Sequence, residues 1–147
     1  MPAKRRLEGV EILVVEDDMD SRVVLAQLLE LQGATVLVAD SGNTALRLLR
    51  KHSPNVLLSD ITMPGMDGIE LIEEIRARER LKKATENVDA YLPAAAISAL
   101  DTPEVRSKCI QAGFHVHIPK PVDFAQLVGI LARLAGRAQG GASGSFG

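Results

Sequence analysis

The sequence predicts an α/β protein in which five strands of a parallel sheet alternate with five helices. Three observations support this prediction. Short apolar runs of strand length recur five times, each run is followed by a segment with the apolar spacing of a helix, and cap and stop residues separate the two kinds of segment. Such alternation produces right-handed β-α-β crossovers, so the strands should be parallel, with helices on both faces of the sheet.

The predicted strands are short runs of β-branched or small apolar residues. The first reads Ile-Leu-Val-Val without interruption, which is typical of a strand that is buried on both faces. The fourth is less typical, because it contains three consecutive alanines and alanine is a poor strand former. The five predicted strands are 12–15, 35–39, 56–59, 94–99 and 114–118.

Each predicted helix begins after a polar residue that can cap it. Either Asp20 or Ser21 is expected to cap the first helix. Thr102 followed by Pro103 is a strong start for the fourth, because proline fits the first turn of a helix, and Gly113 is its expected end. The expected caps of the second, third and fifth helices are Ser41, Asp67 and Asp123.

Changes in composition mark the ends of the folded region. Residues 1–9 are polar and basic, and residues 137–147 form a tail rich in glycine and serine, so we expect both segments to be flexible around a domain at 10–136. Within the domain, the stretch 76–91 is charged and then irregular, which predicts an extended helix end followed by a loop.

Composition excludes several classes of protein. The chain has 147 residues, of which 46% are hydrophobic and 24% charged, enough for one globular domain. Aromatic residues make up only 3% and the net charge is −2, which argues against direct nucleic-acid binding. No apolar run approaches the roughly 18 residues of a membrane span, and no secretory signal is evident. The single cysteine, Cys109, excludes an internal disulfide and is expected to be a packing residue. We therefore expect a cytoplasmic protein.

Polar side chains follow four of the five predicted strands. The carboxyl ends of parallel strands meet at one edge of a sheet, where α/β proteins bind their ligands. We therefore expect these side chains to share one site. They are Glu16, Asp17 and Asp18 after the first strand, Asp60 after the third, Ser98 after the fourth and Lys120 after the fifth.

The chemistry of this set points to phosphate. Two carboxylates about 5 Å apart repel by about 3 kcal/mol at an effective dielectric constant of about 20. A hard cation such as Mg²⁺ removes that cost, since it binds carboxylates, waters and phosphate oxygens. Together with a hydroxyl and a lysine it can neutralise a phosphoryl group in transfer, while a remaining carboxylate serves as nucleophile. The residues alone predict a phosphate-accepting aspartate.

Four motifs in the same order resemble the receiver domain of two-component response regulators, over about residues 10–136. They are Ile-Leu-Val-Val-Glu-Asp at 12–17, Asp-Ile-Thr-Met-Pro-Gly-Met-Asp-Gly at 60–68, Ser-Ala at 98–99 and Lys-Pro at 120–121. The resemblance implies a doubly wound, flavodoxin-like α/β fold with five parallel strands in the order 2-1-3-4-5.

The resemblance also implies roles for individual residues. Asp60 would accept the phosphoryl group, Ser98 would be the switch hydroxyl, and Lys120 would pair with the phosphoryl oxygens before a cis bond to Pro121. His117 occupies the position where the family often has a Tyr or Phe whose rotation reports the switch. The implied Mg²⁺ ligands are Glu16, Asp17, Asp60 and the backbone carbonyl of Thr62.

The implied function is signalling. Such a domain takes its phosphoryl group from a phosphohistidine on a sensor histidine kinase or a histidine phosphotransfer protein, and it catalyses its own phosphorylation and slow dephosphorylation without being an enzyme for another substrate. It signals to a downstream protein through the surface formed by residues 102–137, whose two helices carry enough apolar residues for a phosphorylation-linked homodimer. The chain is expected to be a stand-alone regulator or the receiver of a hybrid histidine kinase. The stretch 76–92 is longer than the family usually needs, which predicts an extended loop.

Two other functions stay open from the residues. Asp18-Met19-Asp20 resembles the D-x-D motif of aspartyl-phosphate phosphatases of the haloacid-dehalogenase type, and a binding module that never needs phosphate could share the fold. The residue that becomes phosphorylated, Asp18 or Asp60, distinguishes the first alternative. His115 and His117 share a face of the predicted fifth strand and could bind a metal, but no third ligand is evident.

Overall fold

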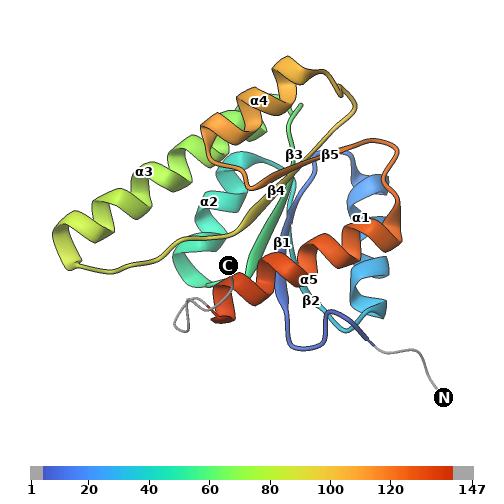
Figure 1. Cartoon of the computed structure of the whole chain (residues 1–147), viewed down its shortest axis with the longest axis horizontal. Helices are drawn as coiled ribbons and strands as arrows, with labels where there is room; N and C mark the ends of the chain where they lie inside the picture. Colours follow the sequence, from blue (N-terminus) through green and yellow to red (C-terminus); the bar gives the residue numbers. More distant parts are fainter. Residues whose placement is uncertain (1–4, 141–147) are drawn as a thin grey trace.

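The structure is a computed structural model that describes residues 5–140, with the side chains of residues 5–136 (Figure 1). Five parallel strands form one sheet in the order β2-β1-β3-β4-β5, which confirms the predicted fold and strand order. The strands are β1 (Glu11–Val15), β2 (Thr35–Ala39), β3 (Val56–Asp60), β4 (Ala94–Ser98) and β5 (Val116–Pro119). The helices are α1 (Met19–Leu31), α2 (Gly42–Lys51), α3 (Gly68–Glu86), α4 (Pro103–Ala112) and α5 (Phe124–Gly140).

The sheet separates two apolar cores. One core lies under α1 and α5, and the other lies under α2, α3 and α4. Alternate residues of β1 enter opposite cores, with Ile12 packed in the first and Leu13 in the second, both fully buried. This two-sided burial explains why the strand reads as a continuous apolar run.

The alanine-rich strand β4 forms despite its weak propensity. Ala94, Ala95 and Ala96 are all completely buried, and β4 pairs with β3 on one side and β5 on the other. Burial and pairing on both edges therefore outweigh intrinsic preference here. The prediction was less accurate for β5, which begins at Val116 instead of 114 because Gly113 and Phe114 still belong to the exit from α4, with both their N–H groups bonded to the Cys109 carbonyl.

The first helix is capped by a residue other than the two that we predicted. The carboxylate of Asp18 accepts a hydrogen bond of 2.9 Å from the Ser21 N–H, and α1 begins at Met19, so the prediction of Asp20 or Ser21 as the cap is wrong. That bond lowers the pKa of Asp18 below its ordinary 3.8. The remaining predicted caps are confirmed, each accepting a bond from a backbone N–H three residues on: Ser41, Asp67, Thr102 and Asp123.

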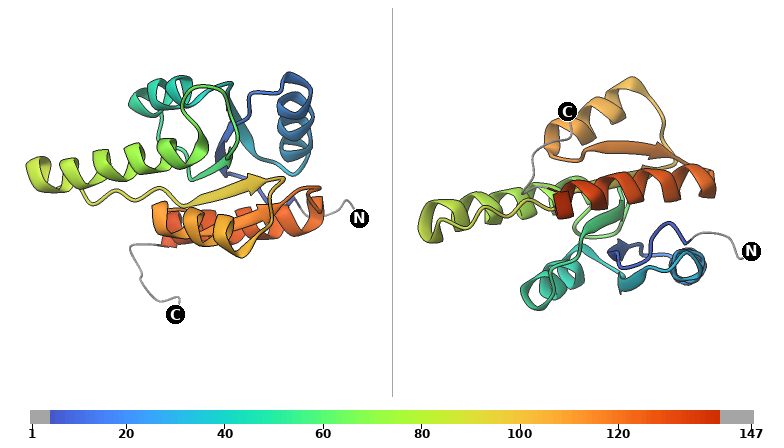
Figure 2. Two further views of the ribbon diagram at one scale, coloured as in Figure 1. Left: turned by 90° about the horizontal axis from the view of Figure 1, so that it is seen from above. Right: turned by 60° about the horizontal axis from the view of Figure 1, so that its bottom comes forward.

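Most of the stretch 76–92, for which we predicted an extended helix end and an extended loop, is helical. Helix α3 has 19 residues and continues to Glu86, where Asn87 adopts a left-handed conformation with φ 56° and ends it. Only residues 87–93 form the irregular connection to β4. Both views of Figure 2 show the far end of α3 standing clear of the other helices. The predicted extended helix end followed by a loop is therefore confirmed, but the loop is shorter than the expected 76–92 because residues 76–86 belong to the helix.

Both ends of the domain carry more structure than the sequence suggested. Leu7 is completely buried among residues of α1 and α5, and its N–H donates a 2.9 Å hydrogen bond to the Gln32 carbonyl, so the N-terminal segment is anchored before residue 9. Helix α5 continues to Gly140, into the predicted tail. The remaining parts of the two segments expected to be flexible, residues 1–4 and 141–147, lie outside the described residues.

Candidate functional site

Three carboxylates meet where β1 and β3 end side by side. Asp60 is the last residue of β3, and Glu16 and Asp17 directly follow β1, its neighbour in the sheet. One oxygen of each side chain lies within 4.8 Å of the other two. Glu16 and Asp60 are buried, whereas Asp17 is exposed. The edge of the parallel sheet therefore gathers these side chains as predicted.

Lys120 reaches the same site from the end of β5. Its Nζ lies 3.3 Å from Oδ2 of Asp60 and 3.5 Å from Oε1 of Glu16. Its backbone N–H donates a 2.9 Å bond to the carbonyl of Ser98, which fixes the chain beyond β5 beside the end of β4. The peptide bond to Pro121 is cis, as the resemblance implies. One ammonium group is thus held between two buried carboxylates.

The charges of the site shift one another's protonation. Burial is the largest cause that raises the pKa of Glu16 above its ordinary 4.5, and the nearby Asp60 carboxylate adds to it, while the Asp18 N–H and Lys120 act in the opposite direction. Burial disfavours the charge on Lys120, but the carboxylates of Asp60 and Glu16 outweigh it and raise the pKa of this lysine above 10.5. Lys120 is therefore charged at neutral pH, and Glu16 holds its proton more tightly than a free glutamate.

The donor set fits a hard divalent cation. Three carboxylates and one ammonium leave an excess of two negative charges when all are ionised, and every side-chain donor that could face the ion is oxygen. This group is the one set of three potential metal-ligand side chains found among residues 5–136. Thr62 is exposed in the segment that follows β3. A role for its carbonyl as a ligand stays a prediction.

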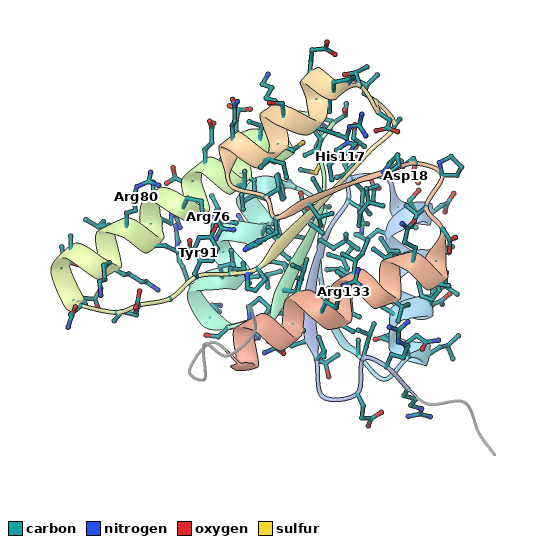
Figure 3. The ribbon with its side chains drawn as sticks, in the orientation of Figure 1. Asp18, Arg76, Arg80, Tyr91, His117 and Arg133 are labelled. Atoms are coloured by element: carbon teal, nitrogen blue, oxygen red, sulfur yellow. The ribbon has the colours of Figure 1, made fainter. Side chains whose placement is uncertain are left out.

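Two further predicted residues make no hydrogen bond or ion pair with Asp60. Ser98 ends β4 and is buried, and its Oγ accepts a 3.0 Å hydrogen bond from the N–H of Leu100. His117 lies on β5 beside α4, with its side chain only 2% exposed (Figure 3). Its Nδ1 is 4.0 Å from Oδ1 of Asp101, and neither ring nitrogen has a hydrogen-bond partner among the described residues.

The alternative sites receive less support from the geometry. His115 precedes β5, and its Nδ1 accepts a 3.0 Å bond from the N–H of Ala94, so it is not part of a metal-binding pair with His117. Asp18, the first residue of the D-x-D motif, uses its carboxylate as a helix cap. Cys109 is completely buried, and burial raises the pKa of its thiol above 9.0, in keeping with a packing role.

Sequence reasoning missed a buried arginine that ties three segments together. Arg76 on α3 is 6% exposed and bonds to Glu79 at 2.8 Å, to the carbonyl of Leu92 at 2.8 Å and to the carbonyl of Gly113 at 2.8 Å. Its guanidinium also stacks 3.7 Å from the ring centroid of Tyr91, and Figure 3 shows the two side chains together. Its helical spacing after Ile72 and Ile75 on the inward face was a signal that could have identified it.

The family model of the response regulator receiver domain matches residues 12–132. The chain belongs to this family. It is a receiver domain of two-component signalling systems, and its acidic cluster lies where receiver domains bind Mg²⁺. No helix among the described residues is both long and apolar enough to cross a membrane.

Curated relatives include proteins of different architecture. An uncharacterized 14.6 kDa protein of Leptolyngbya boryana is 43% identical over 83% of this chain and 87% of its own length. The sensory/regulatory protein RpfC of Xanthomonas campestris pv. campestris is 31% identical over 90% of this chain, and the DNA-binding transcriptional regulator NtrC of Salmonella typhimurium is 34% identical over 83%. The chain spans only 17% of RpfC and 24% of NtrC, so it matches one domain of each.

Solved receiver structures superpose well on this fold. The receiver domain of the sensor histidine kinase PA1611 of Pseudomonas aeruginosa, described with a magnesium ion coordinated in its active-site cleft, is 31% identical with a TM-score of 0.74 and covers 87% of this chain and 98% of its own. The receiver domain of the Francisella response regulator 1452 is 26% identical with a TM-score of 0.76, over 88% of this chain and 98% of its own.

Proposed function

We propose that Asp60 of this receiver domain accepts a phosphoryl group from a phosphohistidine on a sensor histidine kinase or a histidine phosphotransfer protein. The observation that carries the proposal is the position of the Asp60 carboxylate, which ends β3 between two further carboxylates and the Nζ of Lys120 at 3.3 Å. In such a site one carboxylate can act as nucleophile while positive charge gathers on the phosphoryl oxygens.

Each residue has a defined part in the proposed transfer. Lys120 contacts Oδ2 of Asp60, which leaves Oδ1 to attack the phosphorus while the bond from phosphorus to the histidine nitrogen breaks and that nitrogen takes the electron pair. The Lys120 ammonium can then pair with the oxygens of the transferred group. The ligands proposed for Mg²⁺ are Glu16, Asp17, Asp60 and the carbonyl of Thr62, and the ion would neutralise charge on the phosphoryl oxygens.

The signal is proposed to pass through Ser98 to α4. At present the Ser98 Oγ accepts a hydrogen bond from the N–H of Leu100, and a phosphoryl group on Asp60 would offer the Ser98 hydroxyl a charged acceptor for its own proton. Turning the hydroxyl toward it releases that N–H and repacks the segment before α4, beside the buried His117. The altered surface is the face formed by α4, β5 and α5, which would meet a downstream protein or a second copy of the chain.

The domain is further proposed to hydrolyse its own aspartyl phosphate slowly and to act in the cytoplasm, where its phosphohistidine donor would reside. The same chemistry serves a stand-alone regulator and the receiver of a hybrid kinase. RpfC is named a sensory/regulatory protein and NtrC a DNA-binding transcriptional regulator, so similar domains occur within larger proteins of different kinds.

Mass spectrometry of the intact protein after incubation with acetyl phosphate and Mg²⁺ tests the acceptor. We expect a gain of one phosphoryl group in the wild type, none in Asp60→Asn, and a normal gain in the matched control Asp18→Asn. No gain in the folded wild type would favour a phosphate-independent binding module. A gain that survives Asp60→Asn but disappears in Asp18→Asn would favour the phosphatase alternative.

A further inference from the structure

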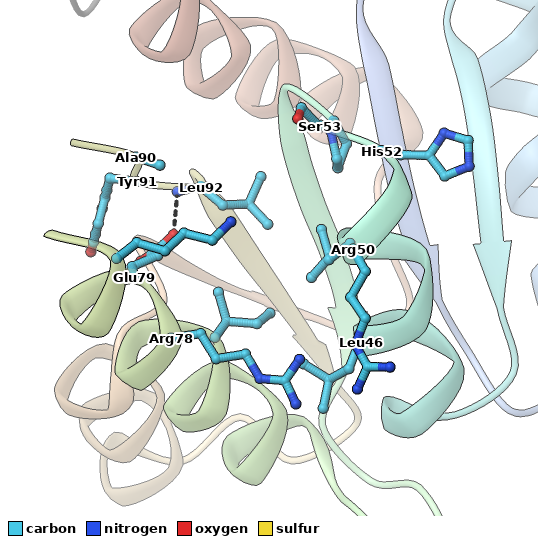
Figure 4. Close-up of a pocket in the computed structure, with 13 residues that line it drawn as sticks. Leu46, Arg50, His52, Ser53, Arg78, Glu79, Ala90, Tyr91 and Leu92 are labelled. Atoms are coloured by element: carbon cyan, nitrogen blue, oxygen red, sulfur yellow. Dashed lines mark hydrogen bonds between the residues drawn. The ribbon is translucent and has the colours of Figure 1, made fainter. Parts of the chain in front are cut away.

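A pocket lies at the opposite end of the sheet from Asp60. It has a volume of about 260 Å³ and opens between α2, α3 and the segment that precedes β4 (Figure 4). Pro54 and Leu92, which contribute to it, stand just before the first residues of β3 and β4, whereas Asp60 is the last residue of β3. We call it the amino-edge pocket. Its lining residues are Leu46, Leu49, Arg50, His52, Ser53, Pro54, Ile75, Arg78, Glu79, Lys82, Ala90, Tyr91 and Leu92.

The body of the pocket is apolar and firmly built. Leu46, Ile75 and Leu92 contribute aliphatic surface from three separate segments. Two hydrogen bonds fix the segment before β4. The N–H of Leu92 donates to the Glu79 carboxylate at 2.7 Å, and Arg76 donates to the carbonyl of Leu92 at 2.8 Å. Figure 4 shows the first of these bonds closing one side of the pocket. A preformed hollow of this kind can hold a ligand without first ordering a loop.

Tyr91 forms a wall whose position is also fixed. Its ring packs edge-on against His115, with centroids 5.3 Å apart, and lies 3.7 Å from the guanidinium carbon of Arg76. The residue nevertheless remains 58% exposed. The free part of this ring gives the pocket an aromatic surface next to its aliphatic one.

The charge around the pocket is mostly positive and mostly unpaired. Its one carboxylate, Glu79, is occupied by Arg76, with both oxygens within 3.1 Å of the same guanidinium nitrogen. Arg50 and Lys82 make no ion pair with any described residue, and Arg78 uses only its Nε, at 3.2 Å from the half-exposed Glu74. Figure 4 shows Arg50 from α2 and Arg78 from α3, both of which line the pocket. The terminal nitrogens of both arginines therefore have no ion-pair partner among the described residues, and an anionic ligand in the pocket can bind them.

We propose that the amino-edge pocket binds a small organic anion, with an aromatic or compact aliphatic body against Tyr91 and the aliphatic residues and a carboxylate or phosphate between Arg50 and Arg78. The apolar lining makes an inorganic anion a poor fit, and the two guanidinium groups select against a neutral ligand. The proposal does not rest on phosphorylation of Asp60, since the two sites lie at opposite ends of the sheet.

The test uses 2-naphthoate as the probe and follows backbone amide shifts of the full chain by NMR. We expect saturable shifts at Leu49, Ser53 and Leu92. Binding should weaken by about fivefold or more in the Arg50→Gln, Arg78→Gln double variant and for the neutral 2-naphthylmethanol. Acetate, which lacks the ring, should not give saturable shifts at these residues. The matched control is Arg80→Gln, which removes a cation from the same helix outside the pocket and should bind normally, as should Asp60→Asn.

Three results would overturn the proposal. The first is saturable binding of 2-naphthoate whose shifts cluster away from the pocket, and the second is equal affinity for the acid and the alcohol. The third is unchanged affinity in the double variant. Because both arginines are partly or fully exposed and Arg78 has only a surface ion pair, the double variant is expected to fold, and its circular dichroism spectrum verifies this. If saturable shifts appear only with an acidic peptide and not with 2-naphthoate, the pocket binds a protein segment and the small-anion proposal is wrong.

Discussion

The two ends of the sheet carry opposite charge, and they are built in different ways. At the carboxyl end, three carboxylates and one lysine come from residues at or next to strand ends, where the backbone fixes them within a few ångströms of one another. At the amino end, the cations come from the helices α2 and α3 on long side chains that remain in contact with solvent. Two of the strand-end carboxylates, Glu16 and Asp60, are therefore buried beside Lys120, whereas the cations that α2 and α3 bring to the pocket lie at the surface.

The difference teaches where a charge is structural and where it is available for a ligand. Arg76 is the exception at the amino end, because its guanidinium is buried and fully used by Glu79, Leu92 and Gly113. Arg78, two residues further along the same helix, has terminal nitrogens with no partner among the described residues. An arginine thus stabilises the fold at position 76, whereas the arginine at position 78 lines a pocket.

We expect the largest change in the free energy of unfolding from Arg76→Met, which tests the structural role of this arginine. The change removes the donors to two backbone carbonyls and leaves the partly buried Glu79 without its cation, so the free energy of unfolding should fall by about 3–5 kcal/mol. Urea unfolding followed by circular dichroism measures it.

The matched control is Arg80→Met on the exposed side of α3, which should change the unfolding free energy by about 0.5 kcal/mol or less. An equal loss of unfolding free energy in the two variants would show that Arg76 does not stabilise the fold as its contacts suggest.

A smaller effect, of opposite sign, is expected from His117→Phe. The ring of His117 buries two nitrogens without hydrogen-bond partners, and phenylalanine fills a similar volume without polar atoms, so the unfolding free energy should rise by about 1–2 kcal/mol. Thermal unfolding measures this, with Asp101→Asn as the control. If both variants are destabilised, the 4.0 Å approach between His117 and Asp101 is a functioning ion pair and the expectation is wrong.

Lys120→Met tests the coupling at the carboxyl end. Lys120 lowers the pKa of Glu16, which burial raises, so its removal should raise that pKa further. A carboxyl group with a raised pKa in the folded state stabilises the fold while it is protonated, and the contribution is lost as the pH rises from 4.5 through the raised value. In the variant this loss should extend to higher pH.

Carbon-13 NMR titration of the Glu16 carboxyl in Mg²⁺-free buffer reads the pKa directly, and unfolding at several pH values reads the stability. Lys108→Met, which removes a lysine from α4, is the control. An unchanged Glu16 titration in Lys120→Met would mean that the two side chains are not coupled in solution.

The smallest effect is expected from Arg78→Gln. Its ion pair with Glu74 is a surface contact, so the unfolding free energy should change by about 0.5 kcal/mol or less, in contrast to Arg76→Met. Urea unfolding in parallel with Arg76→Met gives the comparison. A loss above about 1 kcal/mol would mean that the cation supports the fold and is not reserved for a ligand.

The same contrast explains what the sequence could and could not predict. The carboxyl-end site follows from strand periodicity, because the residue after each apolar run must reach one edge of the sheet, and Asp60 and Lys120 meet there as expected. The cap of α1 was misplaced by two or three residues, since three acidic residues, Asp17, Asp18 and Asp20, compete within four positions and local spacing cannot rank them.

The amino-edge pocket could not be predicted in this way. It depends on how residues 87–93 dock back against α3, which follows from the tertiary contacts of Arg76 and Glu79 with Leu92 rather than from local pattern. Leu7 was missed for a related reason, because one apolar residue in a basic segment has no periodic partner to mark it as buried.

Helix α3 starts directly on the peptide of Asp60. A Cβ atom added at Gly68 would run into the carbonyl oxygen of Asp60 and come within 2.8 Å of the Cα of Ile61, and the Gly68 N–H donates a 2.8 Å bond to the Ile61 carbonyl. Ten residues further on, at about 15 Å along the axis, the same helix carries Arg78 at the mouth of the pocket. Helix α3 therefore contacts the end of β3 with its first residue and lines the amino-edge pocket with its later residues. The first residue of α3 has to be glycine for that contact to exist. The absence of a side chain at this one position therefore lets a single helix run from the carboxyl end of β3 to the pocket at the opposite end of the sheet.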